Sequence, residues 1–149
     1  MLVKKEKIFD NIVAVSGTKK EAIRTISRLC AKQTMLDATQ LEKAVWKREE
    51  WDSTGCGEGI AIPHAIIKEI DEVQLFIVRF QYPIEWESFD DKKVDIAFAI
   101  IAPEEKGQEK YLVFLFMLAR KLVDEKFIVD FRNCRSTEAV YQYVKNELE

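Results

Sequence analysis

Apolar residues follow two different spacings along this chain, and the changes between them predict alternating strands and helices. Segments 73–80 and 94–102 are almost continuously apolar, which is typical of strands covered on both faces by helices. Segment 8–15 mixes β-branched and polar residues and predicts a weaker strand. Segment 59–63 predicts a short strand that ends at Pro63. These four strands indicate a sheet that lies between helical layers.

Helical spacing of apolar residues marks the segments between the first strands. Thr18, followed three residues later by Glu21, forms a capping-box motif that predicts the start of a helix. The apolar stripe of this helix consists of Ala22, Ile23, Ile26, Leu29 and Cys30. A second helix is predicted to begin near Asp37 or Thr39. Its buried face consists of Leu41, Ala44 and Val45.

The C-terminal part of the chain predicts three further helices. Segment 107–123 is apolar on most sides and is expected to be buried. Segment 124–134 predicts a short helix, and Ser136 is expected to cap a last one. The inward-facing residues of that last helix are Ala139, Val140, Tyr143, Val144 and Leu148. The chain is therefore predicted to be a single α/β domain over residues 1–149, with a mixed β-sheet flanked by helices on both faces.

Charge and cysteine content narrow the classes of function. The net charge is −3 and no basic stripe is visible, so we expect no nucleic-acid partner. The three cysteines lack CxxC spacing and predict neither a disulfide framework nor a patterned zinc site. The first residues contain no signal-peptide core, and no apolar run has the length of a membrane span. We therefore expect a cytoplasmic protein that does not insert into a membrane.

A glycine-rich segment, STGCGEGIAIPHA, holds three of the five glycines and the only histidine. Gly55, Gly57 and Gly59 allow tight turns and close approach to a ligand. Their N–H groups, together with the hydroxyls of Ser53 and Thr54, form a candidate phosphate loop. The alternative is a flexible connection in which the two hydroxyls cap a turn.

The histidine of this segment is a candidate nucleophile. In an extended chain Ile60, Ile62 and His64 share one face, and His64 then lies where the predicted strand ends. Side chains at strand ends of α/β sheets commonly line ligand sites, and an imidazole titrates near neutral pH. The alternative is a structural histidine whose hydrogen bonds are satisfied within the protein.

An arginine near the end of the second predicted helix adds a candidate anion ligand. Arg48 lies seven residues after Leu41 and four after Ala44, on the expected buried stripe. A guanidinium there needs an anion or a route to solvent, and it suits the forked geometry of a phosphate. Glu49, four residues after Val45, is expected to orient Arg48. The alternative is an arginine whose head group extends into solvent.

These residues carry a family resemblance. The stretch KREEWDSTGCGEGIAIPHA resembles the signature of the enzyme IIA domains of the bacterial sugar phosphotransferase system. The similar members are the fructose and mannitol class, with galactitol-type and nitrogen-regulatory relatives. They carry an Arg-Glu pair, a glycine-rich loop with Ser/Thr-Gly, and Ile-Pro-His. Two apolar strands, IIAPEE, a leucine-rich helix and a terminal helix follow in the same order, so the resemblance covers nearly the whole chain.

The resemblance implies a phosphocarrier site. His64 is then the phosphoryl acceptor, with Arg48 stabilising the phosphate beside it and Glu49 accompanying Arg48. The implied partners are the phosphocarrier protein HPr, an enzyme IIB and, through IIB, a membrane enzyme IIC; no metal or organic cofactor is expected. The partner is expected to dock on an apolar patch around the mouth of the site that includes Ile60, Ile62 and Trp51. The alternative for Trp51 is a position in the core.

Two positions depart from the family pattern. Many members have a second histidine followed by leucine, where this chain has Tyr111 and Leu112. Tyr111 is a candidate hydrogen-bond donor to the phosphate, but it cannot act as a proton shuttle at neutral pH; the alternative is a packed core tyrosine. Cys56 replaces a more usual aliphatic residue and is expected to act as a small apolar side chain.

Two functions of this site are open at this point. The first is a phosphocarrier that passes the phosphoryl group from HPr to an enzyme IIB during uptake of a sugar or sugar alcohol. The alternative is a regulatory module whose state of phosphorylation at His64 controls partner binding. The chain has no GxSxG motif, which argues against a serine hydrolase. A metal hydrolase would require Cys30, Cys56, Cys134 and His64 to lie close together.

Overall fold

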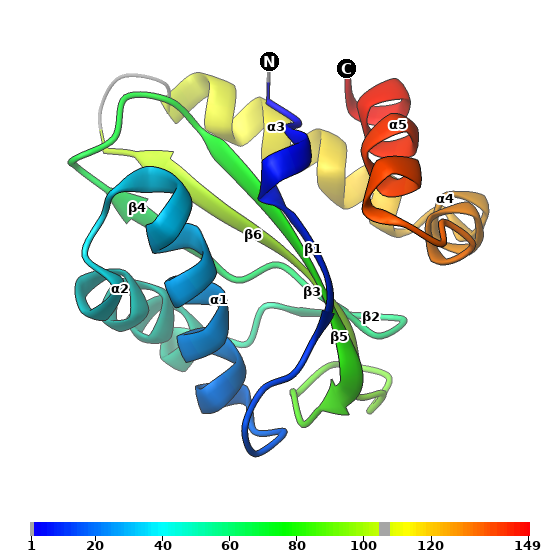
Figure 1. Cartoon of the computed structure of the whole chain (residues 1–149), viewed down its shortest axis with the longest axis horizontal. Helices are drawn as coiled ribbons and strands as arrows, with labels where there is room; N and C mark the ends of the chain where they lie inside the picture. The colour runs from blue at the N-terminus through cyan, green and yellow to red at the C-terminus, as the bar shows by residue number, and fades with distance from the viewer. Residues whose placement is uncertain (1, 105–107) are drawn as a thin grey trace.

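In the computed structural model, which describes residues 2–104 and 108–149, one sheet lies between two layers of helices (Figure 1). The strands are β1 (Ile8–Ile12), β2 (Gly55–Gly57), β3 (Ile60–Ala61), β4 (His64–Ile67), β5 (Gln74–Ile84) and β6 (Val94–Pro103). The helices are α1 (Lys19–Thr34), α2 (Ala38–Trp51), α3 (Gln108–Leu122), α4 (Glu125–Arg132) and α5 (Thr137–Leu148), with a 3₁₀ turn η1 (Lys5–Lys7) before β1.

The sheet combines parallel and antiparallel pairs. Its strand order is β1-β5-β6-β3-β2, and β4 also pairs with β6. β5 and β6 are antiparallel, β1 is parallel to β5, and β3 and β4 are parallel to β6. This mixed sheet confirms the predicted fold class. β1 ends at Ile12, earlier than predicted. Within it Asn11 adopts a φ of 53°, where the register with β5 shifts between Phe9 and Ile12.

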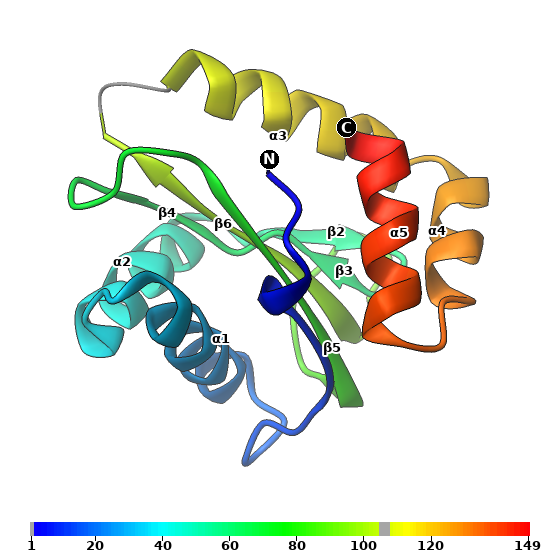
Figure 2. The same cartoon turned by 45° about the horizontal axis from the view of Figure 1, so that its top comes forward.

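Alternate residues of the short strands face two separate cores. Ile60 and Ile62 face the core beneath α3, α4 and α5, whereas Ala61 and Ala65 face the core beneath α1 and α2. Figure 2 shows the two helical layers on opposite sides of the sheet. The predicted shared face of Ile60 and Ile62 is confirmed, and so is the helical cover on both faces.

Pro63 interrupts the edge of the sheet without ending it. Ala61 pairs with Ala97 and His64 pairs with Ile100, so β3 and β4 both follow β6. Pro63 has no N–H to donate, but its carbonyl accepts a hydrogen bond from the Ile100 N–H at 3.0 Å. His64 is therefore the first residue of β4. The prediction that it lies at the end of a strand is wrong, because the continuous β6 allows pairing to resume after the proline.

The predicted caps of α1 and α5 are confirmed. Thr18 Oγ1 accepts a hydrogen bond from the Glu21 N–H at 3.3 Å, and Ser136 Oγ accepts one from the Ala139 N–H at 3.1 Å. The Glu21 carboxylate accepts a hydrogen bond from Arg24. α2 begins at Ala38, one residue after Asp37, and α4 is the predicted short helix.

α3 is not buried on most sides, which corrects the prediction for segment 107–123. The first residue of that segment, Gly107, lies outside the described residues. One stripe of α3 faces the sheet, with Tyr111, Phe114, Leu118 and Leu122 buried. The outer stripe is exposed and consists of Leu112, Val113, Phe116 and Met117. The apolar sequence predicted burial, but α3 belongs to an outer layer of the fold. No helix in the described part combines the length and apolar character needed to cross a membrane.

Candidate functional site

The His64 imidazole is held through one ring nitrogen by the backbone. Its Nδ1 lies 2.7 Å from the carbonyl oxygen of Ile62, which can only accept a hydrogen bond. Nδ1 therefore carries the proton, and in the neutral ring Nε2 keeps its lone pair. The acceptor is a main-chain group two residues away, so side-chain patterns in the sequence gave no signal for it.

The surroundings of His64 favour the neutral ring. Burial lowers the pKa of His64 below its ordinary value of 6.5, while the hydrogen bond to the Ile62 carbonyl raises it. The positive charge of Arg48 lowers this pKa further, and the negative charge of Glu49 raises it. Because the net direction is downward, the imidazole is mostly neutral at pH 7.

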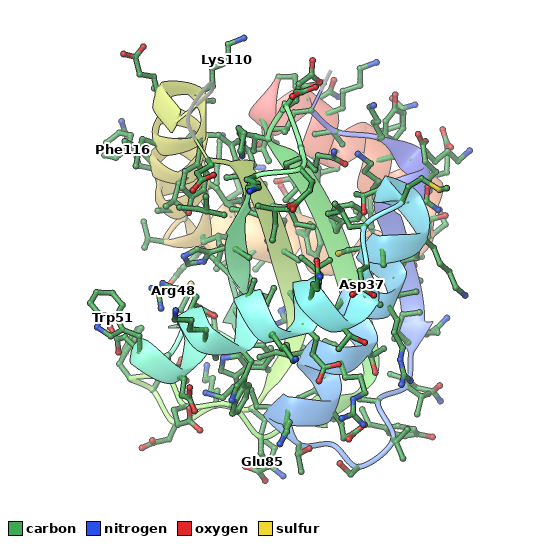
Figure 3. All side chains as sticks on the ribbon, turned by 90° about the vertical axis from the view of Figure 1, so that its left-hand side faces the viewer. Asp37, Arg48, Trp51, Glu85, Lys110 and Phe116 are labelled. Carbon is green, nitrogen blue, oxygen red and sulfur yellow. The ribbon has the colours of Figure 1, made fainter. Side chains whose placement is uncertain are left out.

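Arg48 lies at the C-terminal end of α2, close enough to His64 to act on its charge. Its Nη1 donates to the Asp52 carbonyl at 2.7 Å, and its guanidinium carbon lies 5.3 Å from the centroid of the Trp51 ring. The other guanidinium N–H groups have no acceptor among the described residues. Figure 3 shows Arg48 and Trp51 together at this end of α2. Arg48 is thus anchored at one nitrogen and retains donors for an anion.

Tyr111 approaches the same site from α3. Its ring centroid lies 6.5 Å from that of His64, and its side chain is buried. Burial raises the pKa of Tyr111, and the nearby charge of Arg48 lowers it in part. The net shift is upward, so the phenol keeps its proton at neutral pH and remains a donor. His64, Arg48 and Tyr111 therefore converge from β4, α2 and α3.

Glu49 does not orient Arg48, which corrects the prediction. Its side chain is 2% exposed, and it accepts hydrogen bonds from the Thr54 N–H at 2.7 Å and from the Thr54 hydroxyl. The same carboxylate accepts from Trp86 Nε1 at 3.1 Å and from Lys19 Nζ at 3.3 Å. Glu49 occupies the buried position on α2 that the helical spacing assigned to Arg48, and Arg48 is partly exposed.

No pattern in the sequence pointed to Lys19 and Trp86 as partners of Glu49. Lys19 Nζ also pairs with the carboxylate of Glu87 and lies 5.8 Å from the centroid of the Trp86 ring. Both residues reach Glu49 from segments distant in sequence, so no local pattern connects them. The only available signal was general: a buried indole N–H requires an acceptor.

The hydroxyls of Ser53 and Thr54 are used within the protein. Ser53 Oγ donates to the Glu87 carbonyl at 2.7 Å and accepts from the Gly55 N–H at 3.3 Å. Thr54 is buried, and its hydroxyl donates to Glu49. Each hydroxyl has one proton to donate, and in this structure both protons are used within the protein.

The glycines fit the chain around neighbouring segments. A Cβ on Gly55 would lie 2.3 Å from the Glu87 carbonyl oxygen, which requires glycine at this close approach. Gly57 and Gly59 adopt φ values of 87° and 78° in the turn between β2 and β3. That turn lies at the opposite end of β3 from His64, so the structure does not bring Gly57 and Gly59 to the imidazole (Figure 1).

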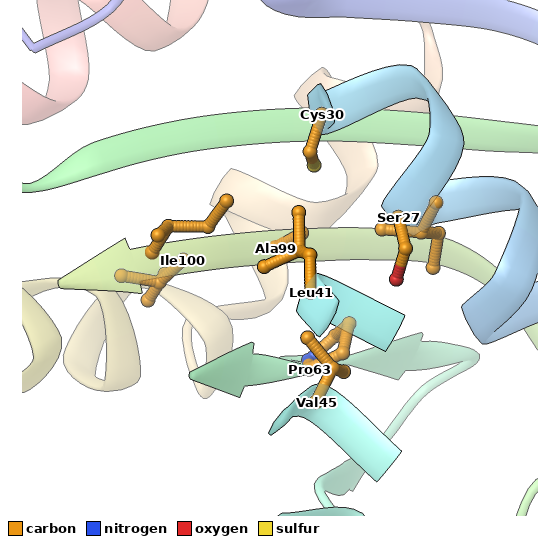
Figure 4. Close-up of a pocket in the computed structure, with 9 residues that line it drawn as sticks. Ser27, Cys30, Leu41, Val45, Pro63, Ala99 and Ile100 are labelled. Carbon is orange, nitrogen blue, oxygen red and sulfur yellow. The ribbon is translucent and has the colours of Figure 1, made fainter. Parts of the chain in front are cut away.

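No metal cluster is found among residues 2–104 and 108–149. No group of three or more His, Cys, Asp or Glu side chains there is arranged to hold a metal ion. Burial raises the pKa of Cys56 to about 11, which makes it an inert, weakly polar side chain. A cavity of about 10 Å³ behind Pro63, lined in part by Ser27 and Leu41, has room for about one water molecule (Figure 4).

Comparison with known proteins identifies relatives of this arrangement. The family model described as "Phosphoenolpyruvate-dependent sugar phosphotransferase system, EIIA 2" matches residues 1–147. The nitrogen regulatory protein of Escherichia coli strain K12 is 35% identical over 129 residues, which cover 85% of this chain and 78% of that protein.

Solved structures share the fold. The nitrogen regulatory protein IIA-Ntr from Neisseria meningitidis superposes with a TM-score of 0.86 at 23% identity, covering 96% of each chain. Enzyme IIA-mannitol of Escherichia coli, solved in complex with phosphorylated enzyme IIB-mannitol, gives a TM-score of 0.74 at 22% identity, covering 97% of each chain.

Proposed function

The chain belongs to the EIIA type 2 family of the phosphoenolpyruvate-dependent sugar phosphotransferase system, and we propose that it carries a phosphoryl group on Nε2 of His64. The observation that carries this proposal is the hydrogen bond from His64 Nδ1–H to the Ile62 carbonyl. That bond leaves the lone pair of Nε2 as the nucleophile of a neutral ring.

The transfer step follows from this tautomer. Nε2 of His64 attacks the phosphorus of a phosphohistidine on an HPr-type donor, a new N–P bond forms, and the donor's N–P bond breaks. The bonding pair returns to the donor nitrogen, while Nδ1 of His64 keeps its proton and its bond to the Ile62 carbonyl. Positioning and charge stabilisation are the main demands of phosphoryl transfer.

Arg48 and Tyr111 are the residues that meet the phosphoryl oxygens in this proposal. The guanidinium has uncommitted N–H groups, and its charge already acts on His64. The protonated phenol of Tyr111 supplies a further donor from α3. Charge-assisted hydrogen bonds to phosphate oxygens stabilise the spread of charge in the transition state.

The role we favour is regulatory. A nitrogen regulatory protein is 35% identical to this chain over most of its length. The phosphorylated and free forms of His64 would then differ by a double negative charge at an exposed apolar surface, which changes the affinity for a partner protein. Delivery to an enzyme IIB in sugar uptake is the second candidate, supported by the family description and by the mannitol IIA–IIB complex.

The partner surface differs from the predicted apolar patch. Ile60 and Ile62 are buried, so they are not available to a partner, whereas Trp51 is 81% exposed. Leu112 and Phe116 on α3 are also exposed, and Figure 3 shows Phe116 along the same side of the molecule as Trp51. We therefore assign partner docking to Trp51, Leu112 and Phe116, which lie on the two helices that supply Arg48 and Tyr111.

Intact mass spectrometry tests the proposed function. Wild type and the variant His64→Ala are incubated with phosphoenolpyruvate, enzyme I and HPr. We expect one acid-labile phosphoryl group on wild type and none on the variant. The phosphorylated protein is then mixed with enzymes IIB of several sugar classes: retention of the group supports the regulatory role, and its loss to one IIB supports sugar uptake. No gain on wild type, while a known enzyme IIA in the same mixture is labelled, would overturn the proposal.

A further inference from the structure

We propose that Glu49 is a positioning residue for His64, acting through Thr54 and Ile62 and not through Arg48. The inference rests on the proposed function for its effect on phosphoryl transfer, but its geometric part stands on the described contacts alone. It gives a reason for a carboxylate that is 2% exposed and whose charge acts on His64.

The first link joins Glu49 to the start of β2. One carboxylate oxygen accepts from the Thr54 N–H at 2.7 Å, and the other accepts from the Thr54 hydroxyl. Two bonds to one residue fix both its backbone and its side chain. Ionised acceptors make stronger hydrogen bonds than neutral ones, so this contact restrains Thr54 more tightly than a neutral pair would.

The second link joins Thr54 to the imidazole. The Thr54 carbonyl accepts from the Ile62 N–H at 3.0 Å, and the Ile62 carbonyl accepts from His64 Nδ1–H at 2.7 Å. Pro63, between them, has a fixed φ and is itself anchored to Ile100. The orientation of the Ile62 carbonyl therefore depends on Thr54, and the tautomer of His64 depends on that carbonyl.

The third link explains how the carboxylate is tolerated in the protein interior. Lys19 Nζ and Trp86 Nε1 donate to the oxygen that also accepts from the Thr54 N–H. Burial of an unpaired charge is costly, and here one cation and neutral donors surround the carboxylate. α1 and the segment after β5 thus help to hold Glu49 in place together with Thr54.

The charge of Glu49 also reaches the imidazole. The groups that face His64 are Arg48 and Glu49 from α2 and Tyr111 from α3. Arg48 lowers the pKa of His64 and Glu49 raises it. Loss of the carboxylate would leave Arg48 unopposed, so the ring would become less basic and less nucleophilic as well as less well positioned.

Nuclear magnetic resonance of ¹⁵N-histidine-labelled protein tests the inference without a phosphoryl donor. His64 is the only histidine, so its two ring nitrogens are assigned without ambiguity. The test variant is Glu49→Gln, which keeps the volume and removes the charge. The matched control is Glu50→Gln, the exposed neighbour on the same helix. We expect Glu49→Gln to lower the pKa of His64 and to increase the fraction of the Nε2–H tautomer, while Glu50→Gln leaves both unchanged.

Transfer kinetics supply the second measurement. We expect the single-turnover rate of phosphoryl transfer to fall about 10- to 100-fold in Glu49→Gln, the usual cost of a misplaced reacting group. Thr54→Val, which removes the hydroxyl link and keeps the carboxylate, should shift the tautomer in the same direction by less. If Glu49→Gln fails to fold, Thr54→Val alone tests whether His64 is positioned through Thr54.

A lower thermal midpoint in Glu49→Gln with wild-type tautomer, pKa and rate would overturn the inference and leave Glu49 with a structural role. A wild-type tautomer, pKa and transfer rate in Thr54→Val would also overturn the inference. If phosphorylated HPr fails to label wild type, the proposed function is refuted instead. The tautomer result would still decide the role of Glu49.

Discussion

At the scale of single residues, the carbonyl of Ile62 determines which nitrogen of His64 keeps its lone pair and, in the proposed function, reacts. The hydrogen bond of 2.7 Å places the proton on Nδ1, and burial keeps the ring neutral. A lone imidazole therefore needs no second histidine to select its tautomer. In the proposed function, the missing second histidine that the family resemblance implies affects contacts to the phosphate oxygens and not the nucleophile.

The lowered pKa of His64 predicts a pH dependence of stability. The unfolded chain has the ordinary value of 6.5, so below it the unfolded state binds a proton that the folded state does not. The contribution of His64 to the free energy of unfolding is present above pH 6.5 and is lost as the pH falls towards the folded pKa. The free energy of unfolding of wild type and of His64→Gln is measured by denaturant titration between pH 5 and 8. Its change with pH should differ between the two proteins. An equal change with pH would contradict the lowered pKa.

Arg48→Lys should slow phosphoryl transfer without unfolding the protein. Lysine keeps the charge but loses the planar fork. With that fork Arg48 donates to the Asp52 carbonyl and, in the proposed function, to a phosphate at the same time. We expect a decrease of about 10- to 100-fold in single-turnover rate, comparable to the loss of one preorganised donor. The thermal midpoint should stay within a few degrees of wild type. Equal transfer rates would remove Arg48 from the site.

The structure brings together residues that the sequence singled out, but several of their contacts differ from those predicted. His64 and Arg48 were identified from a local motif, and the structure brings them together with Tyr111. The partner of Glu49 was predicted wrongly, because Trp86 and Lys19 come from distant segments that no spacing connects. The helical spacing favoured burial of Arg48, yet the neighbouring Glu49 is buried where donors from other elements can satisfy its charge.

At the scale of elements, the helix α3 has two apolar faces, one buried and one exposed. Its inner stripe packs on the sheet and brings Tyr111 to His64, and its outer stripe leaves Phe116 and Leu112 exposed. Strands 73–80 and 94–102 were predicted well because continuous apolar runs indicate burial. The exposure of the outer face of α3 was not predicted, because an apolar sequence is typical both of a buried helix and of a helix with an exposed docking surface.

Phe116→Ser tests the docking role of this outer stripe. Phe116 is 64% exposed, so its removal should change the free energy of unfolding by less than about 0.5 kcal/mol. Transfer from phosphorylated HPr should require a several-fold higher HPr concentration, while the rate at saturation stays the same. Val129→Ser on α4, also exposed, is the matched control and should behave as wild type. Unchanged dependence on HPr concentration in Phe116→Ser would exclude α3 from the interface.

Ser27→Ala tests the packing between α1, α2 and β6. Ser27 is 1% exposed, and its hydroxyl has no hydrogen-bond partner among the described protein groups. Removing an unsatisfied buried hydroxyl should leave stability unchanged or raise it by about 1 kcal/mol, measured as the denaturant midpoint at constant m-value. A loss of more than about 1 kcal/mol would show that the hydroxyl is satisfied in solution.

At the scale of the whole molecule, the fold brings β4, the end of α2 and the start of α3 together at one edge of the sheet. β6 aligns β3 and β4 across Pro63, so that His64 follows two buried isoleucines and lies beside the end of α2. α1 and α2 hold the buried Glu49 on one side of this edge, and α3 covers the other with Tyr111. The fold class was predictable from the period of the apolar residues, whereas this convergence depends on strand pairing that the sequence does not display.

The most direct test of the central claim is the identity of the phosphorylated nitrogen. Protein labelled with ¹⁵N-histidine is phosphorylated by enzyme I and HPr, and the coupling of phosphorus to each ring nitrogen of His64 is measured by nuclear magnetic resonance. We predict coupling to Nε2, with the proton still on Nδ1 and bonded to the Ile62 carbonyl. Coupling to Nδ1, or a phosphoryl group on any other residue, would contradict the account.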